Sequence, residues 1–156
     1  MPNYWMLVGS EENFRITQER GFKIQGVTSV QRRKARRMQP GDRVLYYLKD
    51  ARAFAATATV TSGYREDHTP IWVSRKQGED YPLRIDIRPE VALQQEQWLD
   101  ARQLGPTLEY VRKWPPELWP LAFQEELHLL SQRDFRLIED EMRKVKERVT
   151  AQAGNA

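Results

Sequence analysis

The chain has 156 residues, no cysteine, 40% hydrophobic and 30% charged residues, and a formal net charge of +3. This length fits one domain with a core of its own, and the lack of cysteine excludes a disulfide framework, a thiol nucleophile and a thiolate metal site. No apolar run approaches membrane-spanning length and the N-terminus has no signal-peptide pattern, so we expect a cytoplasmic protein without membrane partners.

The first expected elements are a buried strand and a short helix. Tyr4–Val8 is an apolar run between turn-forming residues, which is typical of a buried strand. Ser10 can cap the N-terminus of the helix, because its hydroxyl accepts a hydrogen bond from a free backbone N–H. Glu11 and Glu12 then stand at the positive end of the helix dipole. Gly21 fits the left-handed position that ends such a helix.

A loop starting at Gly26 and Val27 is expected to lead into the most basic part of the chain. Residues 21–40 contain six basic residues and no acidic one, and their composition favours a short helix over Val30–Arg37. Five of the six crowd that helix: Arg32, Arg33, Lys34, Arg36 and Arg37. This excess indicates either an anionic partner or a solvated helix face, with about equal weight.

Three strands are expected next, at Arg43–Leu48, Ala53–Val60 and Tyr81–Arg88. Their side chains alternate between apolar and polar or between large and small, which is the period-two pattern of a strand with one wet face. The polar segment Gly63–Asp80 is expected to be a long loop that holds a small strand at Ile71–Val73.

The pattern becomes helical after Pro89, with a break at Pro115-Pro116. A last helix begins near Ser131, and its apolar stripe is formed by Phe135, Ile138, Met142, Val145 and Val149. We expect one domain over residues 1–149 and a flexible tail over residues 150–156. The elements together predict an α+β fold, with a strongly curved antiparallel sheet or barrel and helices inserted early and packed late.

Catalytic and metal chemistry are not indicated. The only histidines, His68 and His128, are far apart in the sequence and lack carboxylates at a ligand spacing, so we expect no metal. The glycines stand singly, without a phosphate-binding loop or a nucleophile elbow. We therefore expect neither a cofactor nor catalytic residues, although an enzyme is not excluded.

Aromatic residues beside positive charge are the notable feature of the composition. The chain has five Trp and six Tyr, and Trp72, Trp114 and Trp119 fall near loops or breaks. Core packing explains most such residues. An aromatic platform for a base, beside a basic cluster that holds phosphates, is the functional interpretation.

Over about Asn3 to Lys144 the chain resembles the EVE-domain proteins. The order and spacing of short motifs carry this resemblance: Tyr4-Trp5-Met6-Leu7-Val8 before Ser10-Glu11-Glu12-Asn13, Gly26-Val27 before a basic segment, Pro40-Gly41-Asp42-Arg43-Val44-Leu45-Tyr46-Tyr47, and Trp119-Pro120-Leu121-Ala122-Phe123 before Ser131, Asp134, Phe135 and Ile138. The resemblance implies a PUA-like curved antiparallel β-barrel with inserted and C-terminal helices, related to the PUA, ASCH and YTH domains. It also implies a non-catalytic module that binds DNA or RNA and reads a modified or flipped base.

The resemblance further implies a pocket between the barrel and the inserted helices. Its residues would be Gly26, Val27, Thr28 and Ser29 from the loop, with Trp119 closing it, while the five basic residues at positions 32–37 hold the phosphates. Related sequences often carry Trp just before the Gly-Val pair, where this chain has Gln25. Either another aromatic side chain fills the cage, or the base preference differs, or binding is lost.

Two other functions stay open at the level of sequence. ASCH-like relatives include amidohydrolases built on Lys, Thr and Glu, and Lys34 with Thr28 resembles part of that set, but no Glu is clearly placed. Such an enzyme requires a desolvated Lys of lowered pKa. A small-ligand or protein-interaction module using the same pocket is the third possibility. A pocket lined by Trp, without a buried Lys, would favour a binding module over the enzyme.

Overall fold

The computed structural model describes residues 1–111, 123 and 125–154. Its strands are β1 (Tyr4–Gly9), β2 (Ile24–Val27), β3 (Arg43–Leu48), β4 (Ala53–Val60), β5 (Arg65–Glu66), β6 (Leu83–Ala92), β7 (Leu99–Asp100) and β8 (Leu127–Leu130). Its α-helices are α1 (Glu11–Glu19), α2 (Arg32–Ala35), α3 (Ala101–Leu104) and α4 (Gln132–Gly154). Its 3₁₀ turns are η1 (Ser29–Gln31), η2 (Gln95–Gln97), η3 (Gly105–Thr107) and η4 (Glu109–Val111).

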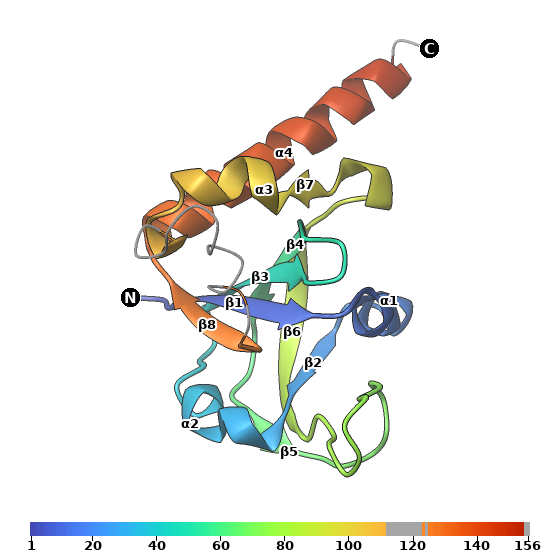
Figure 1. The fold of residues 1–156 in the computed structure, drawn as a ribbon, viewed down its shortest axis with the longest axis vertical. Coiled ribbons are helices and arrows are strands. Elements are labelled where there is room, and N and C mark those ends of the chain that lie inside the picture. The colour runs from blue at the N-terminus through green and yellow to red at the C-terminus, as the bar shows by residue number, and fades with distance from the viewer. Residues whose placement is uncertain (112–122, 124, 155–156) are drawn as a thin grey trace.

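The strands form one curled sheet in the order β2-β6-β4-β3-β1-β8, with β5 beside β6 and β7 beside β4 (Figure 1). The sheet curls into a half-barrel, with α3 and α4 at one end of the molecule and α2 at the other (Figure 1). This arrangement confirms the predicted α+β fold. The sheet is not purely antiparallel, because β1 pairs with β3 in the parallel sense on one edge and with β8 in the antiparallel sense on the other.

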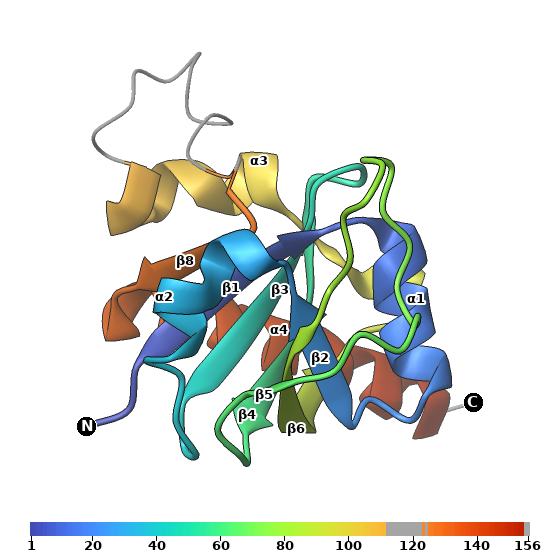
Figure 2. The same ribbon diagram turned by 90° about the horizontal axis from the view of Figure 1, so that it is seen from below.

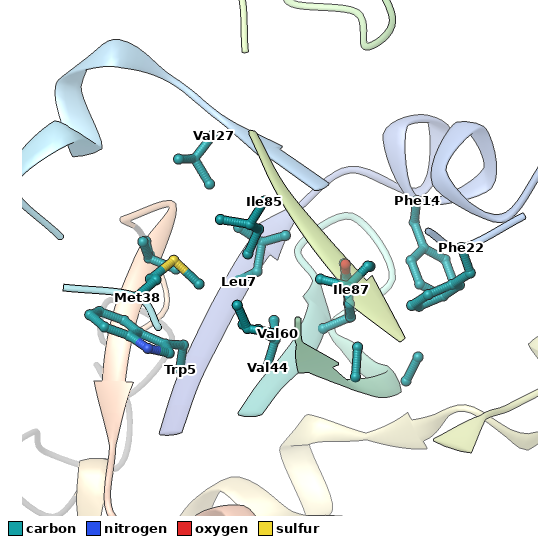
Figure 3. Packing of buried hydrophobic residues seen from close by; sticks show 14 of the residues in the cluster. Trp5, Leu7, Phe14, Phe22, Val27, Met38, Val44, Val60, Ile85 and Ile87 are labelled. Carbon is teal, nitrogen blue, oxygen red and sulfur yellow. The ribbon is translucent and has the colours of Figure 1, made fainter. Parts of the chain in front are cut away.

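Two hydrophobic clusters bury both faces of the central strands. Trp5 and Leu7 of β1 and Val44 of β3 point into the half-barrel, where Phe14 and Phe22 join them (Figure 3). The alternate residues of the same strands pack on the opposite face: Met6, Val8, Leu45 and Tyr47, against Phe135, Ile138 and Met142 of α4. The predicted alternation and the first three residues of the predicted α4 stripe are therefore confirmed. The expected wet face is wrong for β3, since α3 and α4 cover it.

The first helix begins and ends as the sequence predicts. The Ser10 hydroxyl accepts from the Asn13 backbone N–H at its N-terminus. At its C-terminus Gly21 has a φ of 85°, which is the left-handed conformation that glycine adopts without strain. Helix α4 continues through residue 154. Within the described ranges, no helix combines the length and the apolar character that crossing a membrane requires.

Three local expectations are wrong. Gly26 and Val27 do not begin a loop, because they lie in β2 and pair with Arg84 and Leu83 of β6. Ile71–Val73 forms no strand, and the strand within the polar segment is β5 instead. The expected helix over residues 30–37 is shorter, since η1 precedes a single α-helical turn that ends at residue 35.

Candidate functional site

A cavity of about 850 Å³ opens between α1, α2 and the loop that joins β5 to β6, residues 67–82, here called the β5–β6 loop. Its lining includes Gln25 and Gly26 of β2 and the two residues before β8, and β2 and β8 are the two end strands of the sheet. Figure 2 shows α2 on the side of β2 where β8 lies. Side chains link the two end strands. The Thr28 hydroxyl donates to Glu126 and the Lys34 ammonium donates to the Leu127 carbonyl oxygen, at 2.6 and 2.7 Å.

Trp72 is one of the residues that line the cavity, and its indole packs directly on Gly26. A Cβ at position 26 would lie 2.5 Å from Trp72 Cζ3 and 2.7 Å from the Tyr81 carbonyl oxygen, so any larger residue would displace the ring. The Tyr81 ring meets the indole edge to face, with 6.2 Å between the ring centroids. Glycine is thus required at position 26 for close packing, and the expected loop conformation plays no part.

A buried chain of hydrogen bonds fixes the orientation of the indole. Trp72 Nε1 donates to the Thr17 hydroxyl at 2.9 Å, and Thr17 donates to Gln25 Oε1 at 3.3 Å. The Tyr46 hydroxyl also donates to Gln25 Oε1, at 2.9 Å, and burial raises the pKa of Tyr46, which keeps the phenol protonated. Gln25 Nε2 donates to the Gly26 carbonyl oxygen. Gln25 therefore supports Trp72, and Trp72 supplies an aromatic side chain to the cavity.

Arg84 anchors the β5–β6 loop to the sheet. The alternation of β6 predicts an exposed side chain here, but Arg84 is only 2% exposed. Its guanidinium carbon lies 5.3 Å from the centroid of the Trp72 ring. The side chain also donates to the carbonyl oxygens of Tyr81 and Thr69. These contacts hold both ends of the segment that carries Trp72.

A carboxylate, that of Glu126, also lines the cavity. Glu126 accepts from the Thr28 backbone N–H at 3.1 Å and from its hydroxyl, and burial raises the pKa of Glu126 above its usual range. Lys34 donates to Glu125 at 3.0 Å. The sequence analysis missed Glu126, since only the tertiary fold brings it to Thr28.

The structure separates the residues expected in the pocket. Gly26 and Thr28 line the cavity. Val27 is buried in the inner cluster, and Ser29 is exposed outside the lining residues. Trp119 lies outside the residues that the structure describes, so its closing role stays a prediction.

The five basic residues near α2 are also divided. Arg33 and Lys34 line the cavity. Arg32 forms an ion pair with Glu66 at 2.7 Å. Arg36 hydrogen-bonds Tyr64 and thereby lowers the pKa of that phenol. Arg37 lies over the Trp5 ring at 6.0 Å.

Neither histidine lines the cavity. His68 is exposed between Asp80 and Glu66, at 2.6 and 3.4 Å, and these two carboxylates raise its pKa. His128 is buried, which lowers its pKa. In the part of the chain that the structure covers, no group of three or more histidine and carboxylate side chains is placed to hold a metal ion.

Comparison with solved structures identifies the fold. The YTH domain-containing protein mmi1, solved with RNA, matches with a TM-score of 0.67 and 10% identity over 96% of this chain and 87% of that chain. The YTH domain of Zygosaccharomyces rouxii MRB1, solved with N6-methyladenosine RNA, matches with a TM-score of 0.64 and 16% identity over 89% of this chain and 85% of that chain. A hypothetical protein from Leishmania major matches with a TM-score of 0.63 and 18% identity over 95% of this chain and 97% of that chain. The fold is therefore PUA-like, as the sequence resemblance implies.

Sequence comparison identifies the family. A UPF0310 protein of Pyrococcus abyssi is 26% identical over 148 residues, which cover 88% of this chain and 97% of that protein. The family model described as the EVE domain matches residues 3–126. These residues contain the strands β1 to β7, the β5–β6 loop and the Thr28–Glu126 contact. The chain belongs to the EVE domain family.

Proposed function

We propose that this protein binds nucleic acid and takes one modified or flipped base into the cavity beside Trp72. The observation that carries the proposal is the fixed indole of Trp72 on the wall of a cavity of about 850 Å³. This volume falls within the range of small-molecule sites. The RNA-bound YTH domains of the same fold support nucleic acid as the partner.

The cavity offers the contacts that a single base requires. Bases unstacked from a single strand are held by stacking on aromatic side chains and by hydrogen bonds to their edges. Trp72 and Tyr81 provide aromatic surface, while Thr28 and Glu126 provide polar groups. Leu7 and other apolar residues of β1 and β3 add surface against which a methyl group can pack.

Part of the basic cluster at positions 32–37 is placed to meet the phosphates of the bound strand. Arg33 and Lys34 are at the cavity itself, where a backbone that enters with the base passes. The protein acts by binding alone in this scheme, and the chemistry of the base is left unchanged.

The experiment compares oligonucleotides that differ at one position. Fluorescence anisotropy is measured at low salt with single-stranded RNA and DNA that carry a normal base, a methylated base or an abasic residue at the central position. A stacked base contributes about 1–3 kcal/mol, so the abasic strand is expected to bind about 5- to 150-fold more weakly. Equal affinity for all three strands would contradict base recognition.

A matched pair of glycine variants connects this effect to the cavity. In Gly26→Ala the new methyl group displaces the indole, so the preference for a base over an abasic residue is expected to disappear. Gly63→Ala is the control, because a Cβ there meets nothing within 4 Å. Thermal unfolding of both variants confirms that they are folded. If the preference persists in Gly26→Ala, Trp72 is not the base platform.

One observation favours a second candidate, the ASCH-like amidohydrolase. Thr28 and Glu126 are hydrogen-bonded at 2.6 Å, which supplies the Glu that the sequence analysis could not place. The lysine argues against it, because the Lys34 side chain is 35% exposed and pairs with Glu125. Incubation with a nucleoside that carries an acetyl group on its exocyclic amine tests this function. Hydrolysis would release acetate and the free amine, and we expect none.

A further inference from the structure

We propose that the bound strand crosses the mouth of the cavity, with phosphates held by Arg33 on one side and by Lys49, Arg75 and Lys76 on the other. All four side chains line the cavity. The inference rests on the proposed function and specifies the path of the nucleic acid. Most phosphate contacts then lie away from the basic cluster near α2, where the sequence analysis predicts them.

The three residues of the second group gather near the N-terminus of α1. Arg75 and Lys76 follow Val73, whose backbone N–H and carbonyl oxygen both bond the Asn13 side chain, at 2.8 and 2.9 Å. Lys49 precedes Asp50, whose carboxylate accepts from the Glu11 backbone N–H at 3.1 Å. Two loops that are distant in sequence are thus fixed to the same end of one helix.

Arg33 lies across the cavity from this group. It belongs to α2, whereas the second group is attached to α1 and the β5–β6 loop. Figure 2 shows α2 on one side of β2 and α1 on the other. A strand whose base enters the cavity therefore has a cation available on each side of the entry point.

The four cations are available for binding, and unlike Arg36 and Arg37, which are also exposed, they line the cavity. All are exposed, and none forms an ion pair within the described residues. Arg32 and Lys34 are already paired with Glu66 and Glu125. A guanidinium or ammonium without a carboxylate partner binds phosphate without first losing an ion pair.

Five carboxylates line the same cavity, and four of them have partners inside the protein. Asp50 accepts from the α1 backbone, Glu79 from the Ser74 hydroxyl, Glu125 from Lys34 and Glu126 from Thr28. Glu12 is the fifth. These hydrogen bonds hold the carboxylates against the protein but leave them charged, so the lining carries equal numbers of acids and bases. The exposed cations, rather than a net positive charge, supply the phosphate contacts.

Exposed apolar side chains flank the mouth on the same two sides. Val30 of η1 is 85% exposed and Val73 of the β5–β6 loop is 49% exposed, and both line the cavity. Both valines are therefore open to contact with a bound strand. The sugars and bases adjoining the inserted base provide the surface for this contact.

The test compares two double variants that remove the same charge. Arg75,Lys76→Ala removes two proposed phosphate contacts, and Arg36,Arg37→Ala removes two cations of the basic cluster that do not line the cavity. The affinity for a single-stranded 9-mer is measured by anisotropy between 25 and 300 mM salt, with log Kd plotted against log salt. Because each phosphate contact on a single strand contributes about 0.7 to the slope, the first variant should lower it by about 1.4. The second should leave it unchanged.

The result that overturns the inference is equally definite. If Arg36,Arg37→Ala flattens the slope and Arg75,Lys76→Ala does not, the strand follows the basic cluster. The charge-preserving double variant Arg75→Lys with Lys76→Arg should keep the wild-type slope, which excludes an effect of altered loop folding. Failure of the wild type to bind any strand at 25 mM salt would instead overturn the proposed function itself.

Discussion

Gln25 shows how one residue exchange is accommodated by its surroundings. Where related sequences often carry Trp, the shorter amide accepts from Thr17 and Tyr46, and Thr17 in turn accepts from Trp72. The indole thus reaches the cavity from a loop instead of from β2. The first of the alternatives left by the sequence has a candidate in Trp72, which lines the cavity, and base binding itself stays a prediction.

Thr17 is the link in this chain that substitution tests most directly. Thr17→Val keeps the shape of the side chain but leaves the buried Trp72 N–H without an acceptor, so we expect a loss of about 1–3 kcal/mol in the free energy of unfolding. Urea denaturation measures it. Thr107→Val is the control on an exposed 3₁₀ turn, where about 0.5 kcal/mol or less is expected. Similar losses in the two variants would mean that the buried chain contributes little.

His128 makes stability depend on pH in a defined window. Burial lowers its pKa below 6.5, so between pH 6.5 and the lowered pKa the unfolded chain binds a proton that the folded protein does not. The free energy of unfolding should therefore fall as the pH decreases below 6.5. His128→Gln should reduce this dependence, as measured by urea denaturation at pH 5 to 8.

His68 provides the control for that profile, because its shift has the opposite sign. Asp80 and then Glu66 raise its pKa, so its stabilising contribution is complete below pH 6.5 and is lost as the pH rises through the raised pKa. His68→Gln should lower the free energy of unfolding by a constant amount below pH 6.5 and should change its slope against pH only above pH 6.5. If His68→Gln and not His128→Gln changed the slope below pH 6.5, the assignment would be reversed.

At the scale of elements, α4 is held on the sheet by more than its apolar stripe. Glu139 accepts from Arg43 of β3 at 2.5 Å and from the Thr57 hydroxyl of β4 at 2.6 Å. The Arg43 side chain also lies over the Phe135 ring. The side chains of Arg43 and Glu139 are 21% and 10% exposed, so this ion pair is largely shielded from water.

Removing one partner of this pair should cost far more than removing a surface charge. Glu139→Ala leaves Arg43 partly buried without its carboxylate, and we expect a loss of about 3 kcal/mol. Glu141→Ala on the same helix breaks an exposed pair with Lys144, for which about 0–1 kcal/mol is expected. Thermal and urea unfolding of both variants measure the two losses in the free energy of unfolding. A small effect of Glu139→Ala would show that the apolar stripe alone attaches α4.

For the whole molecule, the sequence predicts those parts whose pattern is local. The alternation in β3 and β4 and the Ser10 cap identify their elements directly, because each depends on neighbours in the chain. The strand β2 was not predicted because it contains Gly26, and glycine is a poor strand former. Glycine is present there because the Trp72 indole packs directly on it. The strand β8 has four residues and is defined by its pairing with β1.

The sequence predicts the candidate site less well than the fold, because several site residues are brought together by contacts between distant parts of the chain. Gly26 and Thr28 were found from the family resemblance, and Arg33 from its charge. Trp72 and Glu126 reach the cavity only through tertiary contacts of long sequence separation. A polar loop has no periodic pattern from which the position of an aromatic side chain such as Trp72 could be predicted.

The position of β1 has a consequence for how the protein is made. This first strand of the chain lies between β3 and β8, so during synthesis one of its two neighbours is available early and the other only after Leu130 has left the ribosome. Until then the backbone groups of β1 form an open edge that can pair with another nascent chain. A chain that stops before Leu127 keeps that edge permanently, and it is therefore a poor choice for a shortened version of this domain.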